Sequence, residues 1–240
     1  MAGVGFAAGA VALGGLSRCR ELLRVGDNLT YSALHSLSGT MKLAREYDRR
    51  DISPIVAIGT TDPANFARVV AYDETNGPIY DRLRRNDFVN WRLRIEGAVE
   101  RSLDLSLDDL ARLPARTQIT KHTCEEGWTA IAEWRGVPLA NVLELAGIKP
   151  GARYIHFYPF DLWADSIDML DAFHPQTILA YMMNGERLPI RHGAPVRLRV
   201  ETQLGYKNVK FLRRIVVTES FDPHFETLPA KNGWAWYAGI

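Results

Sequence analysis

The sequence predicts an α+β fold with mixed, β-rich sheets and short helices. Strand patterns dominate from Trp91 onward, and the helical segments between them are short. Strands and helices do not alternate in the regular manner of βαβ units. The 240 residues are 47% hydrophobic, enough to bury a substantial core. Residues 20–240 are therefore expected to form a single domain with an irregular arm over residues 20–90, and residues 1–19 an apolar tail.

The first regular elements are expected between residues 91 and 124. Residues 91–99 alternate apolar and polar side chains, which indicates a half-buried strand. Ser106 and Asp109 have the spacing of a capping box, which begins a short helix that must end before Pro114. Residues 117–124 are expected to form a strand that leads into a glycine-containing loop.

Turn and breaker residues mark the later elements. Pro138 is expected in the first turn of a helix that Gly147 ends. Asn184-Gly185 is a hairpin turn signal. The expected strands of this half of the chain are 153–157, 178–182, 188–190, 196–200 and 211–218.

The N-terminal tail indicates export. Residues 1–16 carry no charge and consist largely of Gly, Ala, Val and Leu. As a helix they would span roughly 24 Å, slightly short for a membrane span and closer to the apolar part of a secretory signal. No Lys or Arg precedes them. We expect a periplasmic protein, exported by the twin-arginine route if the start lies upstream, or one attached to the membrane by this tail. A helix packed on the domain is the alternative.

Charge and cysteine content exclude several classes of protein. The formal charge of +1, from 29 basic and 28 acidic residues, gives no overall attraction to nucleic acid, so no nucleic-acid partner is expected. The two cysteines, Cys19 and Cys124, exclude a disulfide framework and a four-cysteine zinc site. A bridge between them is arithmetically possible, although Cys19 follows the apolar tail.

Cys124 is the first candidate functional residue. It follows Lys121 and His122 at the end of a predicted strand and precedes a glycine loop, whereas a structural cysteine usually has apolar neighbours. Thiolates are soft ligands for redox metals, and a nearby positive charge lowers the pKa of a thiol. An inert thiol and a metal ligand both remain open. His122 and Cys124 could supply two ligands to zinc, but no third or fourth ligand is evident nearby.

A basic cluster in the C-terminal half is the second candidate. Arg197 and Arg199 fall on the same face of their predicted strand, close to glycine-containing turns that could bind a phosphate with backbone amides. A solvated strand face is the alternative explanation for such alternating charge. The cluster comprises Arg191, His192, Arg197, Arg199, Lys207 and Lys210.

Two blocks of sequence around these candidates resemble the sulfite-oxidase-like family of molybdopterin enzymes. The first block is residues 122–129 (HTCEEGWT), followed by 134–139 (WRGVPL). The second is residues 174–185 (HPQTILAYMMNG), which continues through 192–197 (HGAPVR) to 205–210 (GYKNVK). The similarity is greatest to the periplasmic branch that includes the catalytic subunit of the bacterial methionine-sulfoxide reductase.

The resemblance extends from about Trp91 to Thr218 and implies a fold of the sulfite oxidase type, a molybdenum–molybdopterin cofactor (Mo-MPT) and oxygen-atom transfer. It implies that Cys124 is the catalytic residue whose thiolate binds molybdenum. Thr129 and Ala130 stand where some sulfite oxidases have an arginine, which favours an S-oxide or another oxo-acceptor over sulfite. The implied cofactor-binding residues are His35, His192, Arg197, Lys207, Asn208, Val209 and Lys210.

The resemblance also implies the partners. We expect a small-molecule substrate and a cytochrome that exchanges electrons, either a membrane b-type or a soluble c-type, because the chain has no haem-attachment or flavin motif. The family's sulfite oxidases dimerise through an added C-terminal domain. This sequence ends before such a domain could fit, so a monomer is expected. Two alternatives remain open. One is a molybdopterin-binding carrier or sensor without catalysis, and the other is a zinc or thiol protein that uses His122 and Cys124.

Overall fold

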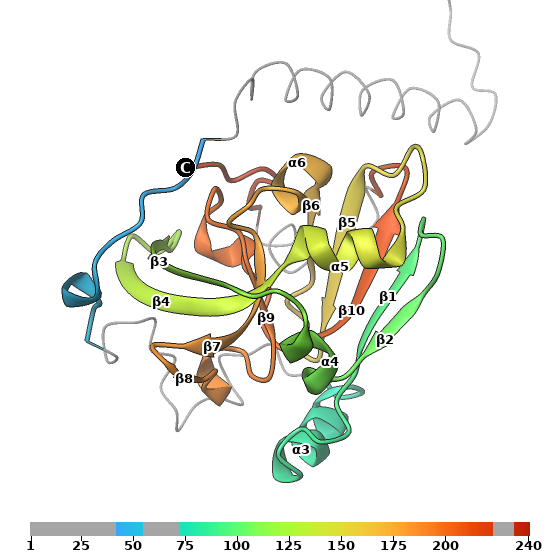
Figure 1. The fold of residues 1–240 in the computed structure, drawn as a ribbon, viewed down its shortest axis with the longest axis horizontal. Helices are drawn as coiled ribbons and strands as arrows, with labels where there is room; N and C mark the ends of the chain where they lie inside the picture. Colours follow the sequence, from blue (N-terminus) through green and yellow to red (C-terminus); the bar gives the residue numbers. More distant parts are fainter. Residues whose placement is uncertain (1–41, 55–72, 223–232) are drawn as a thin grey trace, which may run out of the picture. The chain divides into compact units, whose positions relative to one another are not determined.

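Two β-sheets that share one apolar core form the framework of the described chain (Figure 1). The computed structural model describes residues 42–54, 73–222 and 233–240. The predictions for residues 1–19, for Cys19 and His35, and for much of the arm over 20–90 therefore lie outside the described residues. The expected division into tail and domain stays a prediction. No helix within the described ranges is long and apolar enough to cross a membrane.

The first sheet has the strand order β2-β1-β10-β5-β6. Its β1 and β10 strands run parallel and the other pairs run antiparallel. This mixture agrees with the α+β prediction. The strands are β1 (Leu93–Gly97), β2 (Leu103–Leu105), β5 (Tyr154–Pro159), β6 (Asp165–Asp168) and β10 (Leu212–Thr218).

The second sheet has the order β3-β4-β7-β8, and β9 pairs with β7. All its pairs are antiparallel. The β3–β4 hairpin is the most extended pairing and ends at Cys124. The strands are β3 (Arg116–Thr123), β4 (Thr129–Pro138), β7 (Ile178–Met183), β8 (Glu186–Arg187) and β9 (Arg197–Arg199).

Short helices connect the strands. The apolar face of α5 is fully buried in the cluster that contains residues of both sheets, so this helix is part of the core that joins them. The helices and 3-10 turns are η1 (Arg49–Asp51), α3 (Gly77–Arg85), α4 (Leu107–Arg112), α5 (Leu139–Ala146), α6 (Met169–Ala172), η4 (Ile190–His192) and η5 (Gly205–Lys207).

Most local predictions are confirmed. Ser106 caps α4 by accepting from the backbone of Asp109, whose carboxylate accepts from the Ser106 backbone in return. The hairpin turn is formed by Asn184 and Gly185, with φ values of 52° and 82°. Pro138 proves to be the last residue of β4 and the N-cap of α5 instead of a helical residue.

Two strand predictions were wrong. The hairpin partner of β7 is Glu186–Arg187, not residues 188–190. Leu188 still donates its N–H to Tyr181, but Pro189 has no N–H to continue the ladder. The strand around residues 196–200 was expected to expose one face, whereas all three residues of β9 are buried.

Substitution of Gly136 tests the packing of β4 against β7. It lies at an irregularity in their register, and a Cβ at this position would sit 2.1 Å from the carbonyl oxygen of Leu179. Gly136→Ala should therefore lower the free energy of unfolding by about 3 kcal/mol through overpacking. Urea denaturation measures this effect. Gly185→Ala is the control, because a Cβ there meets no atom within 4 Å and only the positive φ opposes it. Equal effects of the two substitutions would contradict this account of the contact.

Candidate active site

Cys124 stands at the tip of the β3–β4 hairpin, as its sequence position predicted. Its backbone N–H donates to the carbonyl of Trp128 at 2.9 Å, and the N–H of Gly127 donates to the Cys124 carbonyl at 3.1 Å. These two bonds close a tight loop that holds the cysteine backbone in place. Cys124 is a free, half-buried thiol.

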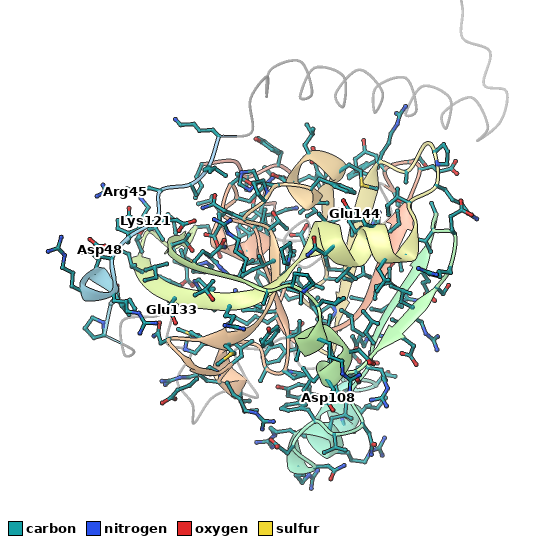
Figure 2. The ribbon with its side chains drawn as sticks, viewed as in Figure 1. Arg45, Asp48, Asp108, Lys121, Glu133 and Glu144 are labelled. Atoms are coloured by element: carbon teal, nitrogen blue, oxygen red, sulfur yellow. The ribbon has the colours of Figure 1, made fainter. Side chains whose placement is uncertain are left out.

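The surroundings of Cys124 favour the neutral thiol. Burial raises the pKa of Cys124 to about 12, and the carboxylate of Glu125, 3.2 Å from Sγ, raises it further. The expected lowering by neighbouring positive charge was therefore wrong. Lys121 is exposed on the outside of β3, as Figure 2 shows, and gives the thiol no charge partner. A bound metal ion would reverse this balance, because a coordinating thiol loses its proton outright.

His122 connects the cysteine loop to β9. Arg199 donates from Nη1 to Nδ1 of His122, which therefore acts as the acceptor of this bond. Burial lowers the pKa of His122 well below its usual range, and the charge of Arg199 lowers it further. A methyl group added to Gly205 would lie 3.0 Å from Nε2 of His122 and 3.3 Å from Cα of Cys124. The start of η5 therefore packs directly against the candidate metal ligand.

The strand residues of the basic cluster are buried, so their interpretation as a solvated strand face was wrong. Arg197 and Arg199 are 2% and 1% exposed. Arg199 pairs with Glu201 at 2.7 Å, and Gln118 donates to the same carboxylate at 2.9 Å. Sequence reasoning did not identify Glu201 or Gln118, although alternation had already placed Arg197 and Arg199 on one face.

Arg197 lacks such a partner. Its guanidinium donates to the carbonyl oxygens of His192 and Asn208 at 3.0 and 3.1 Å and lies over the ring of Trp134. No salt bridge within the described ranges includes it. Burial lowers the pKa of Arg197 to about 9, and the charge of Arg199 adds to this effect. The cation is thus held by carbonyl dipoles without a neutralising carboxylate.

Lys210 adds a further cation, on which the charge of Asp161 acts, and His192 adds unused hydrogen-bonding capacity. The Lys210 ammonium donates to the Arg191 carbonyl at 3.2 Å, and burial lowers its pKa to about 8. His192 is 3% exposed, and its Nε2 has no hydrogen-bond partner among the described residues. Burial lowers the pKa of His192 to about 3, so the ring is neutral. An anion bearing an acceptor or a donor for His192 would satisfy this pocket.

The other predicted cofactor residues have internal partners. Lys207 forms a buried ion pair with Asp165 and donates to the Ser166 carbonyl at 2.7 Å. The Asn208 side chain accepts from Arg199 and from the backbone of Val200. These side chains support β9 and η5, and Val209 is fully buried behind them. Their direct contact with a cofactor stays a prediction.

The donor set fits an anionic organic cofactor that carries a metal. Arg197, Lys210 and His192 would hold the anionic portion, and Cys124 would supply the thiolate. A zinc site finds no support, because no group of three or more His, Cys, Asp or Glu side chains in the described ranges is placed to hold a metal. The Nδ1 atom of His122 is also engaged by Arg199.

Glu201 neutralises the buried charge of Arg199. Glu201→Gln would leave Arg199 buried without a counter-charge, which should lower the free energy of unfolding by about 3 kcal/mol. Glu96→Gln removes the half-exposed pair with Arg214 and should change it by less than about 1 kcal/mol. Denaturant titration of both variants without cofactor checks the difference. A Glu201→Gln variant as stable as wild type would show that Arg199 does not need this partner.

Comparison with known proteins identifies the family of the chain. Residues 80–226 match the family described as the oxidoreductase molybdopterin binding domain. The putative protein-methionine-sulfoxide reductase subunit YedZ1 of Azospira oryzae is 35% identical over 230 residues, which cover 95% of this chain and 84% of that protein. The protein-methionine-sulfoxide reductase catalytic subunit MsrP of Ralstonia nicotianae is 30% identical over 166 residues, covering 62% of this chain and 50% of that protein.

The sulfane dehydrogenase SoxCD from Paracoccus pantotrophus shares the fold. Its TM-score is 0.54 at 21% sequence identity, with 96% of this chain and 58% of that chain covered. The prediction of a sulfite-oxidase-type fold is therefore confirmed. From the matched domain and the first relative, the chain belongs to the oxidoreductase molybdopterin binding domain family and is an oxidoreductase with a molybdenum–molybdopterin cofactor.

Proposed function

We propose that this chain reduces a small organic S-oxide by oxygen-atom transfer, with molybdenum bound to the thiolate of Cys124. The observation that carries the proposal is the pairing of a half-buried thiol with two cations, the buried Arg197 and the half-buried Lys210, that form no ion pair among the described residues. These two residues and His192 are together called the cationic pocket. The two similar proteins are named as methionine-sulfoxide reductase subunits, which supports an S-oxide as the substrate class.

Each residue has a proposed role. When bound, the cofactor supplies two-electron oxygen-atom-transfer chemistry. Cys124 would hold the molybdenum, while Arg197, Lys210 and His192 would hold and orient the anionic part of the cofactor. Two or three charge-assisted hydrogen bonds, at roughly 1.5–3 kcal/mol each, would fix that orientation firmly. His122 remains neutral and braces the cysteine loop through Arg199.

The net reaction requires an electron donor. One S-oxide takes up two protons and two electrons, its sulfur–oxygen bond breaks, and a thioether and water are formed. We propose that a cytochrome supplies the electrons, either a membrane b-type or a soluble c-type. In this proposal the protein is a monomer that acts in the periplasm, exported or attached to the membrane by its N-terminal tail.

The alternatives differ in what they predict. A molybdopterin carrier or sensor would hold the cofactor but turn over no oxo-substrate. A sulfite-oxidising enzyme would favour a small anion, yet Glu125 and Glu126 place two carboxylates next to the thiol. Those charges disfavour an anionic substrate at this point and favour a neutral S-oxide.

Cys124→Ser tests the metal ligand. Protein from a molybdenum-replete bacterial host should contain about one molybdenum and one pterin per chain, and it should reduce S-oxides with reduced viologen as donor. The variant should keep the pterin, because the cationic pocket is intact, but show an altered molybdenum spectrum. Its turnover should fall by at least about a hundredfold, since a removed metal ligand cannot be replaced by binding energy elsewhere.

The outcomes separate the candidates. Pterin and molybdenum without turnover of any S-oxide, N-oxide or sulfite would favour a carrier or sensor. Well-folded wild-type protein with neither molybdenum nor pterin would overturn the proposal. Equal turnover and identical metal spectra in wild type and Cys124→Ser would show that Cys124 is not the ligand.

Lys210→Met tests the cationic pocket. Loss of one charge-assisted bond should reduce pterin retention after gel filtration by about tenfold or more. The free energy of unfolding of the cofactor-free protein should not fall. Burial already disfavours the charged ammonium of Lys210, as its lowered pKa indicates, so its removal costs no stability. Pterin fluorescence after denaturation measures retention. Lys121→Met, on the exposed side of β3, is the control that should retain normal pterin content. Normal retention in Lys210→Met would exclude this lysine from the cofactor site.

A further inference from the structure

A cluster of three aromatic rings, one buried and two half-buried, lies beside the cysteine loop. Trp163 follows β5, Tyr206 belongs to η5, and Trp234 comes from the C-terminal segment. The rings of Trp163 and Trp234 are 5.4 Å apart between centroids, and those of Tyr206 and Trp234 are 5.1 Å apart. None of the three belongs to either cluster of buried apolar residues in the described ranges. We call this group the aromatic cluster.

Hydrogen bonds hold two of the three rings in place. Trp163 donates from Nε1 to the Tyr206 carbonyl at 3.1 Å, and its backbone N–H donates to the carboxylate of Asp161 at 2.9 Å. The Tyr206 hydroxyl donates to the Ala235 carbonyl at 2.7 Å. Trp163 and Tyr206 are thus anchored by hydrogen bonds, and Trp234 packs against both rings. The exposed parts of Trp163 and Trp234 remain available for contact.

The aromatic cluster adjoins Cys124 through η5. Gly205, which packs against the backbone of Cys124, directly precedes Tyr206. The carboxylate of Glu125 lies 3.2 Å from the Cys124 thiol, and its charge also contributes to the raised pKa of Tyr206. Glu125 therefore has the thiol and the tyrosine as neighbours. The cationic pocket around Arg197 and Lys210 is a separate part of the same site.

Partial exposure distinguishes the cluster from ordinary packing. Trp163 and Trp234 are half-buried, and the neighbouring Leu162 is 49% exposed. Large aromatic surfaces left in contact with water next to a reactive group typically mark binding sites. Sulfur makes favourable contacts with aromatic rings, and a methyl group adds burial of apolar area. The adjacent carboxylates select against anions.

We propose that the aromatic cluster is the substrate subsite, and that it receives the neutral methyl–sulfur end of a methyl thioether S-oxide. This inference rests on the proposed S-oxide reduction and adds the residues that select the substrate. Trp163 and Trp234 are specificity-determining residues, since their rings contact the apolar part of the substrate. Free methionine sulfoxide and a methionine-sulfoxide residue in a peptide present the same group.

Trp163→Ala tests the subsite in the cofactor-loaded enzyme. Steady-state kinetics should use N-acetyl-methionine-sulfoxide amide and a short peptide containing one methionine sulfoxide, with reduced viologen as donor. We expect KM to rise about tenfold for both substrates, equivalent to about 1.4 kcal/mol, with kcat within about twofold and pterin content unchanged. A rise for the peptide alone would mean that Trp163 contacts the peptide chain, and would overturn the assignment to the methyl–sulfur end.

Binding measured without turnover provides a second readout. Calorimetric titration with N-acetyl-methionine amide, the thioether product, should show about a tenfold weaker Kd for Trp163→Ala. Trp163→Phe keeps an aromatic face and should stay within about threefold of wild type. If Trp163→Ala does not fold, Trp234→Ala takes its place. This variant removes the facing ring and should show the same tenfold rise in KM and Kd. Tyr237→Ala changes an exposed aromatic of the same segment outside the cluster and should leave KM and Kd unchanged.

The results separate this inference from the proposed function. Unchanged KM and Kd in both alanine variants would overturn the subsite while S-oxide turnover stands. Lower pterin content and kcat with unchanged KM would make Trp163 a support for η5 and also overturn the subsite. Thioether binding that depends on Trp163, in a molybdenum-loaded protein that reduces no S-oxide, would keep the subsite and refute the proposed reduction.

Discussion

The burial of more positive charge than the fold neutralises is the constraint on which the rest of the structure depends. Arg197 and Arg199 lie on a strand with no exposed face and Lys210 is half-buried beside them, yet among the described residues Glu201 forms an ion pair with Arg199 alone. Burial lowers the pKa of His122 and of His192, and the same charges add to this effect, so both rings stay neutral. Uncompensated buried cations are unfavourable by several kcal/mol each unless an anion binds. Cofactor binding and folding stability are therefore linked in this domain, and an anion that binds the native state stabilises it by mass action.

The opposite requirement holds at Cys124. Burial and two carboxylates raise the pKa of the thiol to about 12, so a thiolate there needs a cation in direct contact. The site thus requires a positive ion at the hairpin tip and a negative group over β9. A metal ion carried by an anionic organic ligand meets both requirements at once. A free metal ion satisfies the first alone, and a free phosphate the second alone. This polarity explains why the described residues fit a metal–pterin cofactor better than zinc.

Local signals in the sequence predicted much of the fold and one part of the site. The capping box at Ser106, the Asn184-Gly185 turn and the position of Cys124 at a strand end each depend on a few neighbouring residues. Burial of Arg197 and Arg199 could not be predicted in this way, because it results from pairing of β9 with β7, a strand some twenty residues earlier. The pairing of β4 with β7 is irregular at Gly136, and this irregularity disrupts the alternation of buried and exposed side chains along β4. Asp165, the partner of Lys207, is 42 residues away in sequence and gave no local signal.

The short η5 turn connects the two halves of the site. Gly205 contacts the cysteine loop, Tyr206 contributes its ring to the aromatic cluster, and Lys207 points inward to Asp165. The next residue, Asn208, accepts a hydrogen bond from Arg199. The C-terminal segment holds this turn in place, since Leu204 donates to the Ala238 carbonyl at 2.9 Å. Any shift of η5 would move the aromatic cluster and the support of Arg199 together. The proposed substrate subsite and the proposed cofactor-binding residues are thus built on one segment, so the hydrogen bonds that hold η5 would position both.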